Sequence, residues 1–353
     1  MRHLSTLLVL LVVLSVQTQA KVWRINNNVG VAADFTTFFA AVQASAVVNG
    51  DTLYVEASAN EYTTNSITIN KRLVIIGMGY FLNPDDTNNP PNTGLQAANY
   101  GSPLQYINFG EGSAGSKVLG MSLSYVNIGS STVDINLVFE RCLFYSNGLI
   151  FANATHSGVT VRKCFFIATS ISATSGSVTN FVCENNIFYG YWGGVNMPAL
   201  TGSTNVFRNN SIKDASVSST LVNCYVANNI FGTNNAHSFT NCTIKNNFFS
   251  VNQTLSGTAS NNQVNVNMAD VYVGGTTGSL DSRMMLKSGS PAIAAGVTVG
   301  AVTTPDCGAF GATDPYKLSG IPNIPTIYSL TVPVSIPSGS PTMNITFSTR
   351  NNN

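Results

Sequence analysis

Two cations, Arg141 and Lys163, stand at equivalent places in two successive copies of a short repeated phrase. They would lie side by side in an otherwise neutral patch, so they are the leading candidates for binding an acidic group. Glu140 and Glu184 are near them in the repeat and can instead neutralise them within the protein. The prediction fails if either cation points into a neighbouring loop.

A second candidate is the aromatic cluster of Tyr189, Tyr191 and Trp192. Aromatic rings stack on the apolar faces of sugars, so this cluster predicts a glycan-binding surface. Ordinary packing of a loop against the body of the protein explains the cluster equally well.

Metal and histidine chemistry find little support in the sequence. No close spacing of Cys and His indicates zinc. Beyond the first 20 residues the histidines are His156 and His237, and each lies near a predicted turn where we expect it to face solvent.

The cysteines fall into a repeating arrangement. Cys142 and Cys164 are one repeat apart, and so are Cys224 and Cys242. Stacked neighbours are close enough for a disulfide, but small buried thiols fit the same positions. Both alternatives stay open.

The elements that position these residues follow from an internal repeat with a period of roughly 20 residues. Each copy has two polar residues followed by two mostly apolar ones. Such a period suits three short strands joined by turns and is too short for a helical hairpin. The six copies begin at Arg141, Lys163, Asn185, Asn209, Asn228 and Asn246.

Aligning the copies gives three columns that we expect to stack at about 4.8 Å per coil. The outer two are apolar and are predicted to point inward. The middle column is mostly Asn and is predicted at a bend, where side-chain amides bond one another and the backbone of the turn. The columns are Phe139, Val161, Cys183, Phe207, Val226 and Ile244; Cys142, Cys164, Asn186, Asn210, Asn229 and Asn247; and Phe144, Phe166, Phe188, Ile212, Phe231 and Phe249.

A further column alternates in charge from coil to coil. We expect it to form an exposed ladder of ion pairs, each worth less than about 1 kcal/mol, with a structural role. Its members are Glu140, Arg162, Glu184 and Arg208.

The amino terminus predicts export. Basic residues at the start precede an almost uninterrupted apolar run over residues 7–16, which is too short to span a bilayer comfortably, and small residues precede a cut after Ala20. We therefore predict a signal peptide over residues 1–20 and a secreted protein with no transmembrane segment.

The composition narrows the class of partner. Only 9% of residues are charged and the net charge is +1, so the chain lacks the basic field that nucleic-acid binding needs. An apolar content of 44% argues against disorder. A polar, uncharged surface suits sugars.

Both ends of the repeat region resemble the pectin-lyase-like superfamily of right-handed parallel β-helix proteins. Residues 34–42 and 49–55 are similar to that family's capping helix and first strand. Residues 286–296 and 306–311 resemble the ending of many secreted bacterial members, although those often have Asp where Ala294 stands. Asp34 is expected to cap the helix, which would plug the open end of the core. Its apolar stripe is Phe35, Phe38, Phe39 and Val42.

The resemblance covers roughly residues 30–312 and implies an all-β fold, a right-handed parallel β-helix (solenoid) with an N-terminal capping helix, over residues 21–312. Residues 313–353 are rich in proline and are expected to form a tail or a β-hairpin cap, with strands at 326–334 and 343–348.

The family also includes enzymes that cleave acidic polysaccharides. A polysaccharide lyase or hydrolase acting on uronate glycans is therefore the alternative function, with Arg141 or Lys163 as the base and calcium required only in this case. Our preferred hypothesis is a monomeric bacterial protein, secreted or at the cell surface, that binds a polysaccharide or cell-surface glycan or serves adhesion or scaffolding, without a cofactor. Whether it is also an enzyme stays open.

Overall fold

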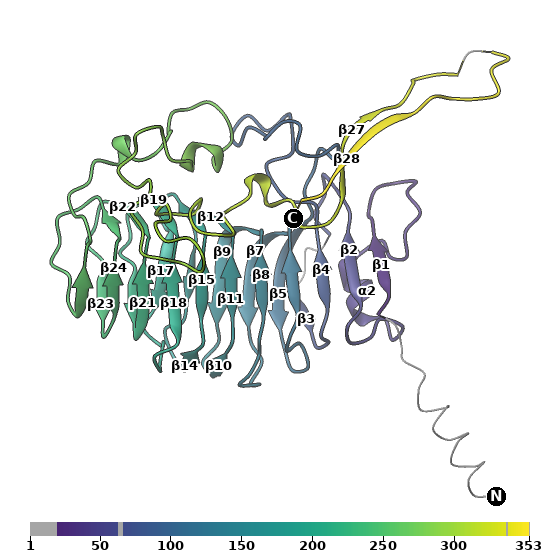
Figure 1. Ribbon diagram of the computed structural model, residues 1–353. Coiled ribbons are helices and arrows are strands. Elements are labelled where there is room, and N and C mark those ends of the chain that lie inside the picture. Colours follow the sequence, from purple (N-terminus) through teal and green to yellow (C-terminus); the bar gives the residue numbers. More distant parts are fainter. Residues whose placement is uncertain (1–19, 63–65, 337, 353) are drawn as a thin grey trace, which may run out of the picture.

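Short parallel strands stack into a β-helix in the computed structural model, which describes residues 20–62, 66–336 and 338–352 (Figure 1). Within that part of the chain, one sheet joins eleven strands, each paired in parallel with the next coil. The predicted fold class, an all-β parallel β-helix, is confirmed. The strands are β1 (Val22–Ile25), β2 (Thr52–Val55), β4 (Val74–Ile76), β6 (Lys117–Leu119), β8 (Val138–Glu140), β11 (Thr160–Arg162), β15 (Val182–Glu184), β18 (Asn205–Arg208), β21 (Cys224–Ala227), β24 (Thr243–Lys245) and β26 (Thr258–Ser260).

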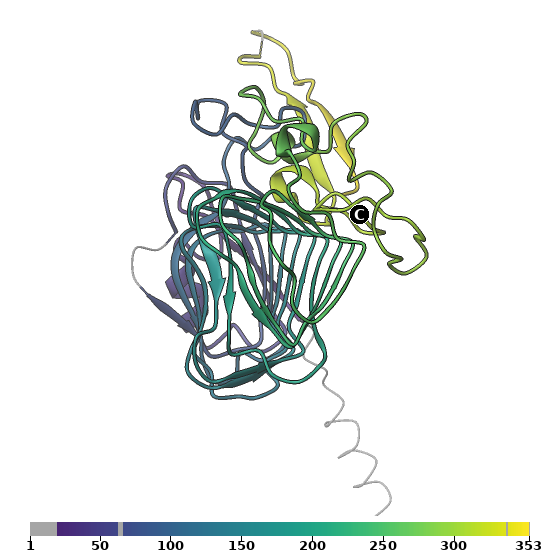
Figure 2. The same ribbon diagram turned by 90° about the vertical axis from the view of Figure 1, so that its left-hand side faces the viewer.

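A second sheet forms the remaining walls of the coils. Figure 2 views the stack from one end, where successive coils overlap. A small parallel pair joins β10 (Thr155–Ser157) to β14 (Ser177–Thr179). The strands of the second sheet are β3 (Ile67–Ile69), β5 (Pro103–Phe109), β7 (Ser122–Ile128), β9 (Leu143–Phe151), β12 (Phe165–Ile167), β13 (Ser170–Ser172), β16 (Ile187–Tyr189), β17 (Gly194–Met197), β19 (Ser211–Ala215), β20 (Thr220–Val222), β22 (Ile230–Thr233), β23 (Ser238–Thr240) and β25 (Phe248–Phe249).

The two predicted apolar columns are confirmed and form the core. Phe139 pairs with Val161, and Val161 with Cys183, in the register that the repeat predicts. In the other column the rings of Phe144 and Phe166 stack face to face with centroids 4.5 Å apart. Every member of both columns is fully buried.

The predicted asparagine column is also confirmed, at the bend between the two sheets. The amide oxygen of Asn210 accepts hydrogen bonds at 3.0 Å from both the backbone and the side-chain nitrogen of Asn186. The oxygen of Asn229 accepts the equivalent bonds from Asn210 at 2.8 and 3.0 Å. The ladder therefore satisfies turn backbone that would otherwise be buried without partners.

The residue before each ladder member has a left-handed backbone. Its φ is +55° at Asn185 and +52° at Asn209, and Asn tolerates this region better than most residues. Arg141 and Lys163 occupy the same position with φ of +57° and +54°. This turn geometry explains why the repeated phrase favours two consecutive asparagines.

A short helix, α2 (Phe38–Gln43), packs at the N-terminal end of the coils, with Phe38 and Val42 in the core. The prediction that Asp34 caps it is wrong: the hydroxyl of Thr37 accepts from the Ala40 amide, and Asp34 accepts from the Arg24 amide. Phe39, predicted in the apolar stripe, is 52% exposed because the six-residue helix turns that side to solvent.

After β26 the chain turns back along one flank and contains the short helices η1 (Met268–Asp270), η2 (Ser282–Met284) and η3 (Leu318–Gly320). We call residues 295–321 the strap, because this segment crosses the coils in reverse order. The side-chain amides of Asn246, Asn228, Asn209 and Asn185 donate in turn to strap carbonyls from Ala295 to Gly311. The last strand of the coils, β26, ends at Ser260.

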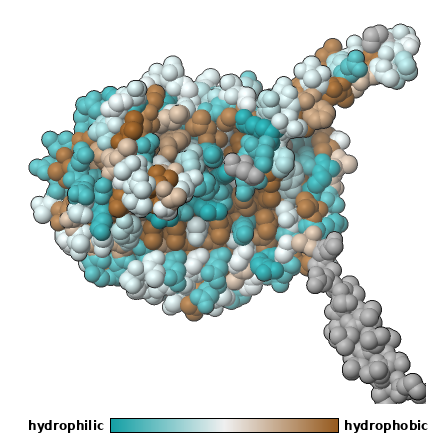
Figure 3. Space-filling view, viewed as in Figure 1, coloured by the Kyte–Doolittle hydropathy of each residue, from teal (hydrophilic) through white to brown (hydrophobic). Residues whose placement is uncertain are grey.

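Near the C-terminus, β27 (Thr326–Thr331) and β28 (Thr346–Arg350) pair antiparallel in a hairpin that projects from the coils (Figure 1). We call this hairpin the arm. Leu330 and Phe347 are 50% and 60% exposed, and apolar atoms are visible near the base of this arm (Figure 3). The predicted signal peptide, residues 1–20, lies outside the described residues except for Ala20.

Candidate functional site

Arg141 and Lys163 lie one coil apart, as predicted, but both are buried beneath the strap. Their side chains are only 2% and 3% exposed. The Lys163 ammonium bonds Glu140 at 2.9 Å and also pairs with Asp314 of the strap. The two cations therefore already contact groups of the protein itself, and only a small part of either side chain is exposed.

The alternating charge ladder has the predicted register, with Glu140 beside Arg162 and Glu184 beside Arg208. The carboxylate-to-guanidinium distances in these two pairs are 2.8 and 2.7 Å. The prediction that the whole ladder is exposed is wrong for Glu140, which is 4% exposed. Burial raises the pKa of Glu140, but bonding and attraction from Lys163 and Arg162 outweigh burial and leave that pKa below its ordinary value.

The aromatic cluster, in contrast, is open to solvent. Tyr191 and Trp192 lie in the turn after β16, and they are 56% and 58% exposed. Their rings meet edge to face with centroids 4.8 Å apart. Tyr189 is half-buried, and the Lys213 ammonium sits 5.7 Å from its ring centroid. Tyr191 and Trp192 thus form an exposed pair, whereas Tyr189 lies against Phe165 and the strap covers Arg141 and Lys163.

One polar hollow includes Trp192 of this turn, and a second includes Lys213, whose ammonium lies near the Tyr189 ring. The backbone of Tyr191 accepts from the Ser216 amide at 2.9 Å, which fixes the turn against residues 213–218. That segment contributes to both hollows. One has a volume of about 350 Å³ and contains Trp192, Ser218 and Asn196.

The other hollow has a volume of about 610 Å³ and contains Lys213 and Asp214, which form an ion pair. Its remaining polar side chains are hydroxyls and amides from three later segments of the chain. They are Thr233, Asn234, Ser250, Asn265 and Asn267. No sequence signal singled out these residues, because each is one polar residue among many and only the stacking of coils brings them together.

Both histidines are buried, so the prediction that they face solvent is wrong. His156 is fully buried, and burial lowers its pKa. His237 lies against the ring of Phe231, accepts from the Ser219 amide at 3.0 Å and bonds the Thr233 hydroxyl. Burial lowers the pKa of His237 to about 4.

All six cysteines are buried free thiols in the structure. The Cys142 amide donates to the sulfur of Cys164 at 3.4 Å, so these two residues continue the asparagine ladder with sulfur acceptors. Burial raises the pKa of the Cys183 and Cys224 thiols well above their ordinary value, which leaves them protonated and unreactive at neutral pH.

Within the described residues, no three His, Cys, Asp or Glu side chains converge to hold a metal ion. In the same part of the chain, no helix has the length and apolar content to cross a membrane.

No protein-family model matches the sequence, and no curated protein matches it. Three chains of solved structures match, and one is described as the crystal structure of pectate lyase Pel9A. It shares 12% sequence identity with a TM-score of 0.34, over 84% of this chain and 97% of that chain. The fold described above therefore rests on the strand pairing of this protein itself.

Proposed function

We propose that the protein is a secreted or cell-surface β-helix that binds a polysaccharide across the face containing Tyr191 and Trp192. The observation behind this proposal is the combination of two exposed aromatic rings with two hollows lined by hydroxyls and amides. Sugar rings offer an apolar face for stacking and a rim of hydroxyls for hydrogen bonds, so this combination suits them.

The hollows lie along several coils, which favours an extended chain over a single sugar. Lys213 and Asp214 neutralise each other, so we propose a neutral or weakly charged polymer. Export is proposed from the amino-terminal sequence pattern, and a bacterial source from the resemblance of the sequence. The rigid stacked body also suits adhesion or scaffolding, in which glycan binding would provide the attachment.

The first prediction concerns Trp192. Replacement Trp192→Ala removes the larger stacking surface, which is worth about 1 kcal/mol, so retention on a bound polysaccharide should fall roughly fivefold to tenfold. The mature chain, residues 21–353, would be tested on a panel of neutral and uronate polymers by affinity electrophoresis.

The matched control is Tyr106→Ala. Tyr106 is 38% exposed and its ring centroid lies 5.8 Å from that of Tyr125. Both tyrosines belong to earlier coils than the aromatic turn. Equal losses in the two variants, or none in Trp192→Ala, would remove the aromatic turn from the binding site. The same mixtures would be assayed for cleavage of the polysaccharide. Unsaturated sugar products, seen by ultraviolet absorbance, or new reducing ends would favour a polysaccharide lyase or hydrolase over simple binding.

A further inference from the structure

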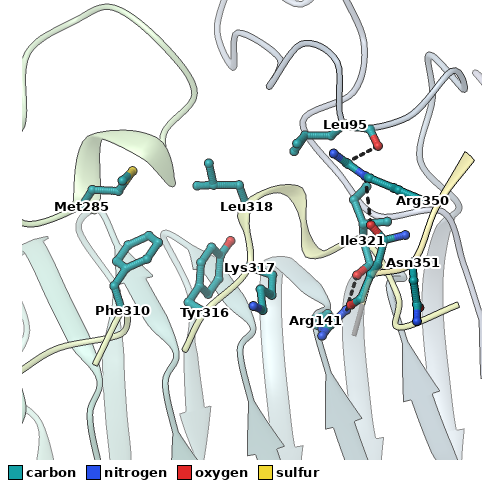
Figure 4. Close-up of a pocket in the computed structure, with 11 residues that line it drawn as sticks. Leu95, Arg141, Met285, Phe310, Tyr316, Lys317, Leu318, Ile321, Arg350 and Asn351 are labelled. Atoms are coloured by element: carbon teal, nitrogen blue, oxygen red, sulfur yellow. Dashed lines mark hydrogen bonds between the residues drawn. The ribbon is translucent and has the colours of Figure 1, made fainter. Parts of the chain in front are cut away.

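A cleft of about 440 Å³ opens where the strap, the base of the arm and the loop containing Leu95 meet (Figure 4). It shares no residue with the hollows beside Trp192. Arg141 lies at its foot, Ile321 and Arg350 border one side, and Phe310 and Tyr316 border the other.

Among the described residues that line this cleft, the charged ones are the cations Arg141, Lys317 and Arg350. Two carboxylates are nearby: Asp314 pairs with Lys163, and Glu140 is shared among Lys163, Arg162 and, at 3.7 Å, Arg141. A third carboxylate, Asp281, lies behind Tyr316. It accepts hydrogen bonds from the Tyr316 hydroxyl, the Ser319 amide and other neutral donors. The cleft therefore has an excess of positive charge.

Arg141 is incompletely partnered. One terminal nitrogen donates to the carbonyl oxygens of Ile321 at 2.6 Å and Asn352 at 2.9 Å. Its Nε is buried without a hydrogen-bond partner, 3.7 Å from a Glu140 oxygen. Burial lowers the pKa of Arg141, which indicates that its surroundings do not fully compensate the charge.

Holding the strap does not require a cation at this position. In later coils an asparagine occupies the same left-handed turn, and Asn185 alone donates to two strap carbonyls at 2.9 and 2.8 Å. Arginine at position 141 adds charge and length that strap docking does not need, which indicates a second role.

The opposite wall of the cleft is apolar. The rings of Phe310 and Tyr316 meet edge to face with centroids 5.4 Å apart, and Met285 beside them is 42% exposed. An anion with a hydrophobic body would contact this wall while its charge lies toward the cations.

We propose that this cleft binds a small organic carboxylate that has an aryl or alkyl body. The volume of the cleft suits a ligand of roughly ten non-hydrogen atoms. The guanidinium and ammonium groups pair with the carboxylate, and the aromatic wall covers the apolar body.

The test uses isothermal titration calorimetry of the mature chain, residues 21–353, with 3-phenylpropanoate. The neutral 3-phenylpropanamide and the short propanoate are the comparison ligands, and each should bind about tenfold more weakly or less. Lys317→Gln should weaken 3-phenylpropanoate binding roughly fivefold, because Lys317 is half-buried at the rim of the cleft and loses one charge-assisted contact. Lys117→Gln is the matched control, because Lys117 is exposed on β6 and outside the cleft, and it should have no effect.

Failure of 3-phenylpropanoate to bind would overturn the proposal. Equal binding of the amide would exclude recognition of the charge, and equal binding of propanoate would exclude the apolar wall. Equal effects of Lys317→Gln and Lys117→Gln would place the ligand elsewhere. Because Lys317 makes no contact with the aromatic turn, these outcomes are independent of polysaccharide binding.

Discussion

At the bend between the two sheets, the central coils have two consecutive polar residues that make different contacts. The first, such as Asn209, has a left-handed backbone and directs its amide outward to the strap. The second, such as Asn210, is fully buried and bonds along the axis to the next coil. One amino acid type therefore serves both an outer and an inner contact.

The inner contact predicts a large effect of Asn210→Ala. The Asn210 amide donates to the Cys183 carbonyl and to Asn229, and its oxygen accepts from the backbone of Asn186. Removing it leaves buried groups without partners, so the free energy of unfolding should fall by about 3 kcal/mol. Urea denaturation measures this loss. The exposed loop variant Asn99→Ala should change stability by less than about 0.5 kcal/mol, and a similar small change in Asn210→Ala would contradict the ladder.

His237 predicts a loss of stability in mild acid. Its folded pKa is about 4, below the ordinary value of 6.5, because burial disfavours the charged ring. The unfolded chain therefore takes up the proton first as pH falls below 6.5, and stability declines until pH approaches 4. From pH 7 to pH 5 this residue should cost about 2 kcal/mol.

The variant His237→Asn isolates that contribution. An asparagine oxygen can still accept from the Ser219 amide, but it does not titrate. Denaturation at pH 7 and pH 5 should show a smaller loss for the variant than for the natural protein. If the two proteins lose the same stability, His237 is not the titrating group.

Among the elements, the strap predicts a local effect that is distinct from a global one. Asn185→Gly deletes two hydrogen bonds to the strap and still accepts the φ of +55°. Amides in residues 306–316 should exchange with solvent roughly tenfold faster, while those of β18 and β21 keep their protection. Hydrogen exchange with mass spectrometry measures both.

Asn185→Ala is the companion variant. It deletes the same bonds but adds the strain of a left-handed alanine, about 1 kcal/mol, so global stability should fall further than in Asn185→Gly. Unchanged exchange of the strap in both variants would show that these hydrogen bonds do not hold it.

The sequence predicts the coils well and the strap poorly, for a physical reason. Stacked columns repeat a side-chain type in phase, so Phe139 or Asn186 can be placed by counting. The strap is held mostly through its backbone carbonyls, such as those of Ala309 and Ile321, which have no signature in the sequence. Arg141 could therefore be recognised as unusual, but its burial could not be predicted.

Smaller errors have similar causes. Asp34 and Thr37 are both good helix caps three residues apart, and in the structure Asp34 instead accepts from the Arg24 amide while Thr37 caps the helix. His156 and His237 lie near turns, but neighbouring phenylalanines enclose both rings. The aromatic turn is the part of the candidate site that local sequence could indicate, because Tyr191 and Trp192 are adjacent; the polar hollows needed the complete stack of coils.

At the scale of the whole molecule, the strap changes the contact pattern of a solenoid. Coils contact mainly their neighbours, but the strap joins late residues to early ones. The hydroxyls of Tyr316 and Tyr80 are 2.5 Å apart, although 236 positions separate the two residues in the sequence. Solenoids without such a segment can unfold locally from either end. Here several coils share one covalent segment that spans them.

That span has a mechanical consequence. When a solenoid is pulled along its axis, its coils can peel away one at a time, because each boundary between coils is strained in series. The strap runs in parallel with those boundaries from Asn246 to Arg141 and would share the tension among them. Stretching this protein along the axis should therefore require several coils to unfold together instead of one after another.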